Sequence, residues 1–251
     1  MERTAFFEAL AVALSANGLP QATDEQAEQF YLLSLELCAA NETMNLTAIT
    51  DMRQMIVRHL CDCAFAAGTD IFPENSTVAD IGAGAGFPTL PLAILRPDLH
   101  IMAVDSTEKR MMYVARTAKK LGLSNVTTLA ARAETLGHED AYREQFDCVS
   151  ARAVARLNVL CEWCLPLVKT GGRFVAMKAK RGAEELTGAQ NALRLLHTQV
   201  IAEQKPLLTD PFAESDSPDK TQSRHIIVMK KNAPTDKKYP RANGQIMKKP
   251  L

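Results

Sequence analysis

The stretch "STVADIGAGAGFPTLPLAIL" constrains the fold of this chain more than any other. A short β-branched run ends at Asp80, a turn carries Gly82, Gly84 and Gly86, and an apolar segment with helical spacing follows Phe87. Glycine lets a backbone turn tightly and approach a ligand closely. In open α/β sheets, ligands bind where a strand passes into its helix. The unit therefore predicts an α/β fold with a ligand site at this turn.

The rest of the chain repeats the alternation of strand and helix, from residue 76 to about residue 231. Such alternation predicts a doubly wound, mostly parallel sheet of seven strands, a Rossmann-like α/β fold. We expect the last two strands to form an antiparallel hairpin at the sheet's edge. We also expect a helix over residues 157–172 that stops at a glycine pair. The seven predicted strands are STVADIGA, HIMAVDS, NVTTLAAR, FDCVSAR, RFVAMKAK, TQVIAEQKPLL and RHIIVMKK.

The first part of the chain has a different texture, with apolar residues at helical spacing. It predicts helices over residues 4–18, 24–41 with Asp24 as N-cap, and 50–68 with Thr50 and Asp51 at the cap. We therefore predict three parts: an N-terminal helical extension packed on the core (1–70), a ligand-binding core (71–231) and a basic C-terminal tail (232–251).

Composition excludes some classes of protein. The formal net charge is zero, so no global charge points to nucleic acid or membrane, although the chain from residue 230 onward carries seven cations and one acid. No apolar run reaches membrane-spanning length, and the N-terminus lacks a secretory signal pattern. The six cysteines lie in apolar periodic contexts, which favours packed thiols in a reduced, cytoplasmic protein over a zinc site.

The glycine turn itself indicates the ligand. A dinucleotide fingerprint would need G-x-G-x-x-G, but Phe87 stands where its last glycine belongs, and no Gly-Lys-Ser/Thr run supports a P-loop. Asp105 ends the second strand, nineteen residues after Gly86. A carboxylate there can accept hydrogen bonds from both ribose hydroxyls of an adenosine. Together these features favour S-adenosylmethionine as cofactor, with S-adenosylhomocysteine as its product.

The tip of the fourth strand, "FDCVSARAVARL", bears on the methyl acceptor. It lacks the Asn/Asp-Pro-Pro-aromatic run expected of exocyclic amine methylation, and Cys148 lies within the strand rather than at its tip, where cytosine-C5 chemistry would need a nucleophile. A ring nitrogen such as guanine N7 has a free lone pair and needs no base. Methylation of N7 is helped instead by alignment of the guanine with the methyl donor and by groups that offset the positive charge developing on the purine.

A set of short motifs then resembles a known family. In order, they are MNLTAITD, RHLCD, DIGAGAGFP, DSTEKR, ARAE, SARAVA, LVKTGGRFVAMK and KKYPR…KKPL. From about Asn45 to Leu251 the chain resembles the RsmG (GidB) family of bacterial class I methyltransferases, which act on guanine N7 of 16S ribosomal RNA. It departs from the family pattern at Ala40, Cys63 and Ile246, positions we expect to lie outside the cofactor pocket.

The resemblance implies roles for individual residues. Arg152, Arg132 and Lys178 would act on the target guanine, the RNA phosphates or, for Arg152, the cofactor. The expected cofactor-binding set is Gly82, Gly84, Gly86, Phe87, Asp105, Ser106, Ala133, Glu134 and Arg152, with no metal. The partner would be 16S rRNA, within a small ribosomal subunit or an assembly intermediate, and we expect a monomer with no obligate protein partner and no membrane association.

Two further interpretations stay open at this point. The chain could be a cofactor-dependent methyltransferase of a small molecule or protein, for which the basic tail would be dispensable, or a non-catalytic rRNA-binding assembly factor. Lys237, Lys238, Tyr239 and Arg241 place an aromatic ring among cations, a combination that favours phosphate contact and stacking on a base of RNA. By contrast, His59 and Asp62 on one helix favour a packed or surface pair over an acid/base site.

Overall fold

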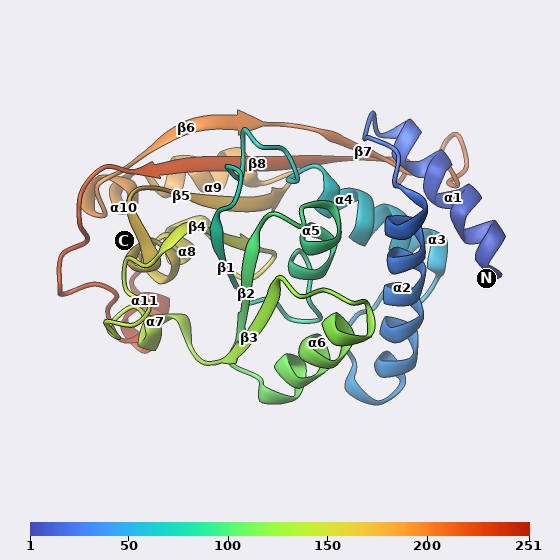
Figure 1. Ribbon diagram of the computed structural model, residues 1–251. Coiled ribbons are helices and arrows are strands. Elements are labelled where there is room, and N and C mark those ends of the chain that lie inside the picture. Colours follow the sequence, from blue (N-terminus) through green and yellow to red (C-terminus); the bar gives the residue numbers. More distant parts are fainter.

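A computed structural model describes all residues, 1–251, as a sheet between two layers of helices (Figure 1). The strands along the sheet run in the order β3-β2-β1-β4-β5-β8-β6, and the short β7 extends the pairing of β8. The sheet is parallel from β3 to β5, while β8 is antiparallel to both neighbours. The strand bounds are β1 Thr77–Ile81, β2 His100–Asp105, β3 Val126–Ala130, β4 Phe146–Arg152, β5 Val168–Ala179, β6 Thr198–Gln204, β7 Leu207–Thr209 and β8 Thr221–Lys231.

The seven-stranded, mostly parallel sheet predicted from the sequence is confirmed, with β7 as an additional short strand. The last two predicted strands do form an antiparallel pair at the edge of the sheet; β8 is the inner strand of this pair, next to β5, and β6 is the outer strand. The reason is burial: residues 225–229 of β8 are an uninterrupted buried run, as an interior strand requires, whereas β6 alternates between half-buried and exposed residues.

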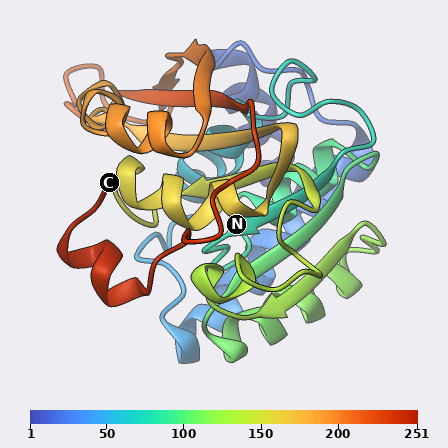
Figure 2. The same ribbon diagram turned by 90° about the vertical axis from the view of Figure 1, so that its left-hand side faces the viewer.

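Helices cover both faces of the sheet (Figures 1 and 2). The N-terminal helices pack with α5 and α6 in one apolar cluster, while α7, α8 and α10 share another. None of these helices is both long and apolar enough to cross a membrane. The helix bounds are α1 Arg3–Ala16, α2 Asp24–Met44, α3 Met52–Met55, α4 Asp62–Ala64, α5 Thr89–Leu95, α6 Glu108–Lys120, α7 Ala133–Leu136, α8 Leu157–Cys164, α9 Gly182–Gly188, α10 Gln190–Leu195 and α11 Asn243–Lys248.

The N-terminal helices join the core directly. Phe6 of α1 and Leu33 of α2 are fully buried in the same cluster as Leu90 of α5 and Val114 of α6. The N-cap of α2 is Thr23, not Asp24 as predicted: its hydroxyl accepts from the Gln26 amide while the Gln26 side chain accepts from Thr23, a reciprocal capping box. The division into extension, core and tail stays a prediction.

The predicted helix over residues 50–68 is interrupted. Between α3 and α4, residues Ile56–Cys61 form a π-helical turn, η1. The prediction of one regular helix was wrong because apolar spacing cannot reveal a widened turn, and π turns often occur at functional sites. The buried residues of η1 include Leu60 and Cys61, while Arg58 and His59 stay partly accessible.

The helix predicted over residues 157–172 ends earlier than expected. Helix α8 stops at Cys164, a single 3₁₀ turn spans Leu165–Leu167, and β5 has already begun at Val168. Pro166 provides the physical reason, since proline lacks the amide that a continuing helix needs. The pair Gly171–Gly172 therefore lies within the irregular start of β5, where the register with β4 shifts.

The C-terminal tail is packed on the molecule rather than free. Lys231 is fully buried, and its ammonium donates to a Glu144 carboxylate oxygen at 2.6 Å and to two backbone carbonyls. Arg143 donates to the backbone carbonyls of Thr235 and Tyr239. The Tyr239 ring is only 6% exposed, so the prediction that it stacks on an RNA base is wrong.

A buried carboxylate stands at the end of β1, just before the glycine turn. Asp80 is 1% exposed and accepts hydrogen bonds from the hydroxyls of Thr89, at 2.6 Å, and Ser150, at 2.9 Å. These bonds connect β1 with the start of α5 and with β4. Burial nevertheless raises the pKa of Asp80 to about 6, because the charged form loses its hydration.

This shift predicts a pH dependence of stability. Between pH 4 and 6 the folded protein retains a proton on Asp80 that the unfolded chain has lost, so stability falls as pH rises through this window. Asp80→Asn removes this component. We expect the free energy of unfolding of the variant, relative to the unmodified protein, to increase by roughly 1–2 kcal/mol from pH 5 to pH 8 in urea titrations.

The exposed Asp140 offers a matched control. Asp140→Asn should show no such pH-dependent difference. A difference between Asp80→Asn and the unmodified protein that stays constant with pH would contradict the raised pKa.

Candidate active site

The parallel registers bring the predicted site residues to one edge of the sheet. Ile81 at the end of β1 pairs with Val104 of β2 and with Ala151 of β4. Asp105 in turn pairs with Ala130 at the end of β3. Because parallel strands end at the same edge, the residues that follow each strand converge around the glycine turn.

Asp105 ties this turn in place. One of its carboxylate oxygens accepts from the Gly84 amide at 3.2 Å, and the other accepts from the Thr107 amide at 2.8 Å. Arg110 lies 3.6 Å from the first of these oxygens. A carboxylate has more acceptor positions than these amides use, so Asp105 can still accept from a ligand's hydroxyls. The Thr107 side chain makes no capping bond at the start of α6.

A cavity of about 250 Å³ opens beside Asp105. Of the predicted residues, Gly82, Asp105, Ser106, Arg132, Ala133 and Glu134 line it. The sequence interpretation missed Val154, Trp163 and Asn243, which also line this cavity, as does Arg110. No local pattern identifies the missed three, because the loop after β4, helix α8 and the C-terminal tail meet there only in the folded chain.

The three glycines of the turn have different roles. Gly82 has φ +74°, and a Cβ on it would lie 2.5 Å from a methyl group of Val154. Gly84, at φ +57°, has only a backbone oxygen 3.8 Å away. A Cβ on Gly86 would lie 2.7 Å from Leu90, so this glycine allows α5 to pack closely against the turn. Of the three, only Gly82 lines the cavity.

Phe87 faces away from this cavity and packs on His59. Their rings stack with centroids 4.6 Å apart, and the His59 Nε2 lies 3.0 Å from the Thr47 hydroxyl. Burial, reinforced by Arg152, lowers the pKa of His59 to about 4, so the ring is neutral at neutral pH. His59 is packed, as interpreted, but it does not pair with Asp62, which binds Arg152 and Arg224 instead.

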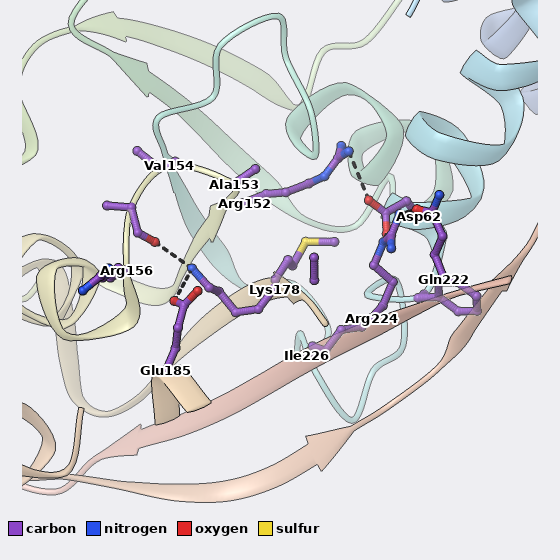
Figure 3. A pocket seen from close by; sticks show the side chains of 14 residues that line it. Asp62, Arg152, Ala153, Val154, Arg156, Lys178, Glu185, Gln222, Arg224 and Ile226 are labelled. Carbon is purple, nitrogen blue, oxygen red and sulfur yellow. Dashed lines mark hydrogen bonds and ion pairs between the residues drawn. The ribbon is translucent and has the colours of Figure 1, made fainter. Parts of the chain in front are cut away.

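A second cavity, of about 500 Å³, adjoins the first at Val154, which lines both (Figure 3). It holds two of the three predicted catalytic residues, Arg152 at the end of β4 and Lys178 near the end of β5. Arg132 lines the smaller cavity instead, and its side chain is 63% exposed. The structure thus brings Arg152 and Lys178 together and places Arg132 apart from them.

Arg152 belongs to a buried ionic cluster centred on Asp62 (Figure 3). The carboxylate of Asp62 contacts Arg152 at 3.1 Å through one oxygen and Arg224 at 2.6 Å through the other. Arg152 also donates to the backbone carbonyl of Arg58 at 3.0 Å. Burial opposes its charge, but the neighbouring Cys63 and Asp62 hold the pKa of Arg152 above its usual value. Two arginines share one carboxylate, which leaves the cluster positive.

Lys178 forms a second ionic pair in the same cavity. Its ammonium lies 2.7 Å from a Glu185 carboxylate oxygen and donates to the Ala155 carbonyl at 2.6 Å. The same Glu185 oxygen accepts from the Leu157 amide at 2.9 Å. These contacts hold the loop after β4 against β5 and α9. They leave the other oxygen of Glu185 without a protein partner.

The smaller cavity suits the nucleoside part of S-adenosylmethionine. Because Gly82 has no side chain, the cavity has space at this position; a side chain there would collide with Val154 and make the cavity smaller. Asp105 provides a carboxylate for ribose hydroxyls, and Ala133 and Glu134 at the start of α7 form the next part of the wall. The residues present therefore fit this cofactor.

Comparisons with known proteins agree with this geometry. The family model described as rRNA small subunit methyltransferase G, GidB, matches residues 25–207. Ribosomal RNA small subunit methyltransferase G of Oceanobacillus iheyensis is 44% identical over 239 residues, which cover 95% of this chain and 96% of that protein. The protein of the same name from Halalkalibacterium halodurans is 45% identical over 233 residues, 93% of each chain.

Solved structures with low sequence identity support the fold alone. The YcgJ protein from Bacillus subtilis aligns with a TM-score of 0.50 at 16% identity, over 70% of this chain and 100% of that one. A ribosomal protein L11 methylase from Lactobacillus delbrueckii aligns with a TM-score of 0.50 at 14% identity, over 70% of this chain and 79% of that one.

Gly82 and Gly84, two of the three glycines of the turn, make a matched pair for a test. Both have positive φ, so alanine strains the backbone at either position by on the order of 1 kcal/mol. Only at Gly82 does the new methyl also meet Val154 at the cavity wall. We expect Gly82→Ala to weaken S-adenosylhomocysteine binding at least tenfold and Gly84→Ala to weaken it less, measured by isothermal titration calorimetry. Equal losses would mean that backbone strain, not the cavity wall, governs binding.

Proposed function

Because this chain belongs to the rRNA small subunit methyltransferase G family, we propose that it transfers a methyl group to N7 of one guanine in 16S rRNA. The chain is an S-adenosylmethionine-dependent rRNA methyltransferase. The observation that supports methyl transfer to a guanine is the pair of adjoining cavities at the carboxyl ends of the strands. They provide separate sites for the methyl donor and the acceptor, and Val154 lines both.

The smaller cavity would hold the methyl donor. Asp105 would accept from its ribose hydroxyls, Gly82 would let the backbone approach it, and Ala133 and Glu134 would lie at the adenine. When bound, this cofactor supplies an electrophilic methyl group on a sulfonium. The chain's own task is to orient the acceptor and exclude water.

The larger cavity would receive the guanine. Guanine N7 carries a free lone pair, so the site needs no general base. Positive charge develops on the purine as the methyl group arrives. Because Asp62 is paired with two arginines and Glu185 with Lys178, this cavity would act mainly by aligning N7 with the methyl group. The oxygen of Glu185 without a protein partner can also accept from the N1–H or N2–H groups that distinguish guanine from adenine.

Exposed cations near the two cavities suit RNA phosphates. Arg132 and Arg156 are exposed and line the smaller and the larger cavity, respectively, and exposed Lys180 follows β5. The target base must leave its stack to enter, at a cost of a few kcal/mol. We propose that a small ribosomal subunit or its assembly intermediate in the cytoplasm presents this guanine. We propose that the protein acts as a monomer.

A labelling experiment tests this function. Purified protein would be incubated with methyl-labelled S-adenosylmethionine and small ribosomal subunits from cells that lack the gene, and the digested RNA analysed by mass spectrometry. Label in 7-methylguanosine at one site is the expected result. Label in another nucleoside would move the acceptor, and cofactor binding without any RNA label would favour a different substrate or a non-catalytic role.

Arg152 allows a second prediction, because it lines the acceptor cavity and not the donor cavity. We expect Arg152→Ala to slow methyl transfer on the order of a hundredfold, the loss typical when one preorganised hydrogen-bond donor is removed from a reaction site. The dissociation constant of S-adenosylhomocysteine should change less than threefold. Arg152→Lys, which keeps the charge beside Asp62, controls for misfolding and should recover part of the rate.

A large loss of cofactor affinity in Arg152→Ala would instead assign Arg152 to the donor site. The melting temperatures of both variants separate this outcome from a general loss of structure.

A further inference from the structure

The end of the chain forms part of the cofactor cavity's wall. Residues 239–246 contact two helices of the core: Pro240 lies against Gly137 at the end of α7, and α11 packs against α8. Arg241 binds Glu162 of α8 through backbone and side chain, with N···O distances of 2.8, 2.8 and 2.6 Å, and Glu162 is fully buried. Ile246 is also fully buried, and His138 contacts the Pro240 carbonyl at 2.7 Å. This segment is therefore anchored on both sides of Asn243.

Two polar atoms in this part of the wall lack partners. The indole nitrogen of Trp163 and the side-chain oxygen of Asn243 are both buried and make no hydrogen bond, although both residues line the cavity. Buried polar groups in proteins are nearly always satisfied, and an unsatisfied one is destabilising. One of these atoms is a donor only and the other is an acceptor only. Such a pair suits a ligand that can both accept and donate.

We propose that Trp163 and Asn243 bind the adenine ring of the cofactor, so that the C-terminal tail is a component of the methyl-donor site; this rests on the proposed function. The adenine amino group donates to the Asn243 oxygen, and an adenine ring nitrogen accepts from the Trp163 indole. Arg241 and Glu162 are positioning residues, because their ion pair holds Asn243 over α8. The ribose is bound by a different residue, Asp105, whose carboxylate also accepts a hydrogen bond from the Gly84 amide of the turn.

This proposal accounts for the packed tail better than an RNA-binding arm does. Tyr239 is buried, Lys238 pairs with Asp236 at 3.0 Å, and Arg241 is held by Glu162. Two of the four residues expected to contact RNA, Tyr239 and Arg241, are thus engaged within the protein, whereas the Lys238 ion pair is exposed. The tail's contacts instead lead to the cavity, because Arg241 binds Glu162 and Asn243 lines the cavity; Figure 2 shows the course of the tail along the molecule.

The composition of the chain supplies a direct probe, since Trp163 is its only tryptophan. Titration of the full-length protein with S-adenosylhomocysteine should change the tryptophan emission saturably. The same titration with S-inosylhomocysteine, which has an oxygen in place of the adenine amino group, should give a dissociation constant about tenfold higher, because this oxygen faces the Asn243 oxygen.

Variants then test each residue by calorimetry. Asn243→Ala should weaken S-adenosylhomocysteine binding about tenfold and abolish the preference over the inosine analogue. Trp163→Phe, which keeps an aromatic ring but removes the donor, should weaken binding of both ligands severalfold. Exposed Gln245 in the same helix makes no side-chain hydrogen bond, so Gln245→Ala is the matched control and should bind like the unmodified protein.

The outcomes separate this inference from the function on which it rests. If the unmodified protein binds no S-adenosylhomocysteine, the proposed function fails. If it binds but Asn243→Ala keeps its affinity, or loses affinity equally for both analogues, adenine recognition by Asn243 is wrong. Binding seen by calorimetry without any change in tryptophan emission would likewise overturn the assignment of Trp163.

Discussion

The parallel pairing of β1 with β2 and β4 is the constraint on which the site depends. It places Ile81, Val104 and Ala151 side by side. The turn after β1 therefore lies next to the Asp105 carboxylate at the end of β2 and next to the loop after β4. Asp105 then links the turn to the start of α6 through two backbone amides. A one-residue slip in register would move Asp105 away from the turn.

Buried ion pairs fasten distant segments to this frame. Asp62 joins the N-terminal helices to β4 and β8, Glu144 holds Lys231 at the end of β8, and Glu162 holds Arg241 in the tail. Burying charges carries a large desolvation penalty, so such pairs are weak contributors to net stability. Removing one partner leaves an uncompensated charge, which makes these pairs effective in specifying where a segment docks. Burial lowers the pKa of Lys231, and the contacts of its ammonium with Glu144 oppose that effect.

Interpretation of the sequence succeeded where local chemistry decides the outcome. Strand-helix alternation, the glycine turn and the acid after the second strand each follow from short-range rules, and the structure places Gly82 and Asp105 on one cavity. It failed where packing overrides those rules. A π turn interrupts an apolar periodic helix at residues 56–61. Tyr239 resembles an RNA-stacking residue in the sequence but is buried in the fold.

The sequence by itself determined the fold class, the ligand turn and the family, because glycine spacing, strand patterning and short sequence motifs are properties of adjacent residues. Only the tertiary structure decided which residues share a chamber. Arg132 and Arg152 are twenty positions apart yet line different cavities, whereas Ile81, Trp163 and Asn243, far apart in the chain, line the same one. The physical reason is that side-chain proximity across a sheet follows from strand order and burial, which no single segment encodes.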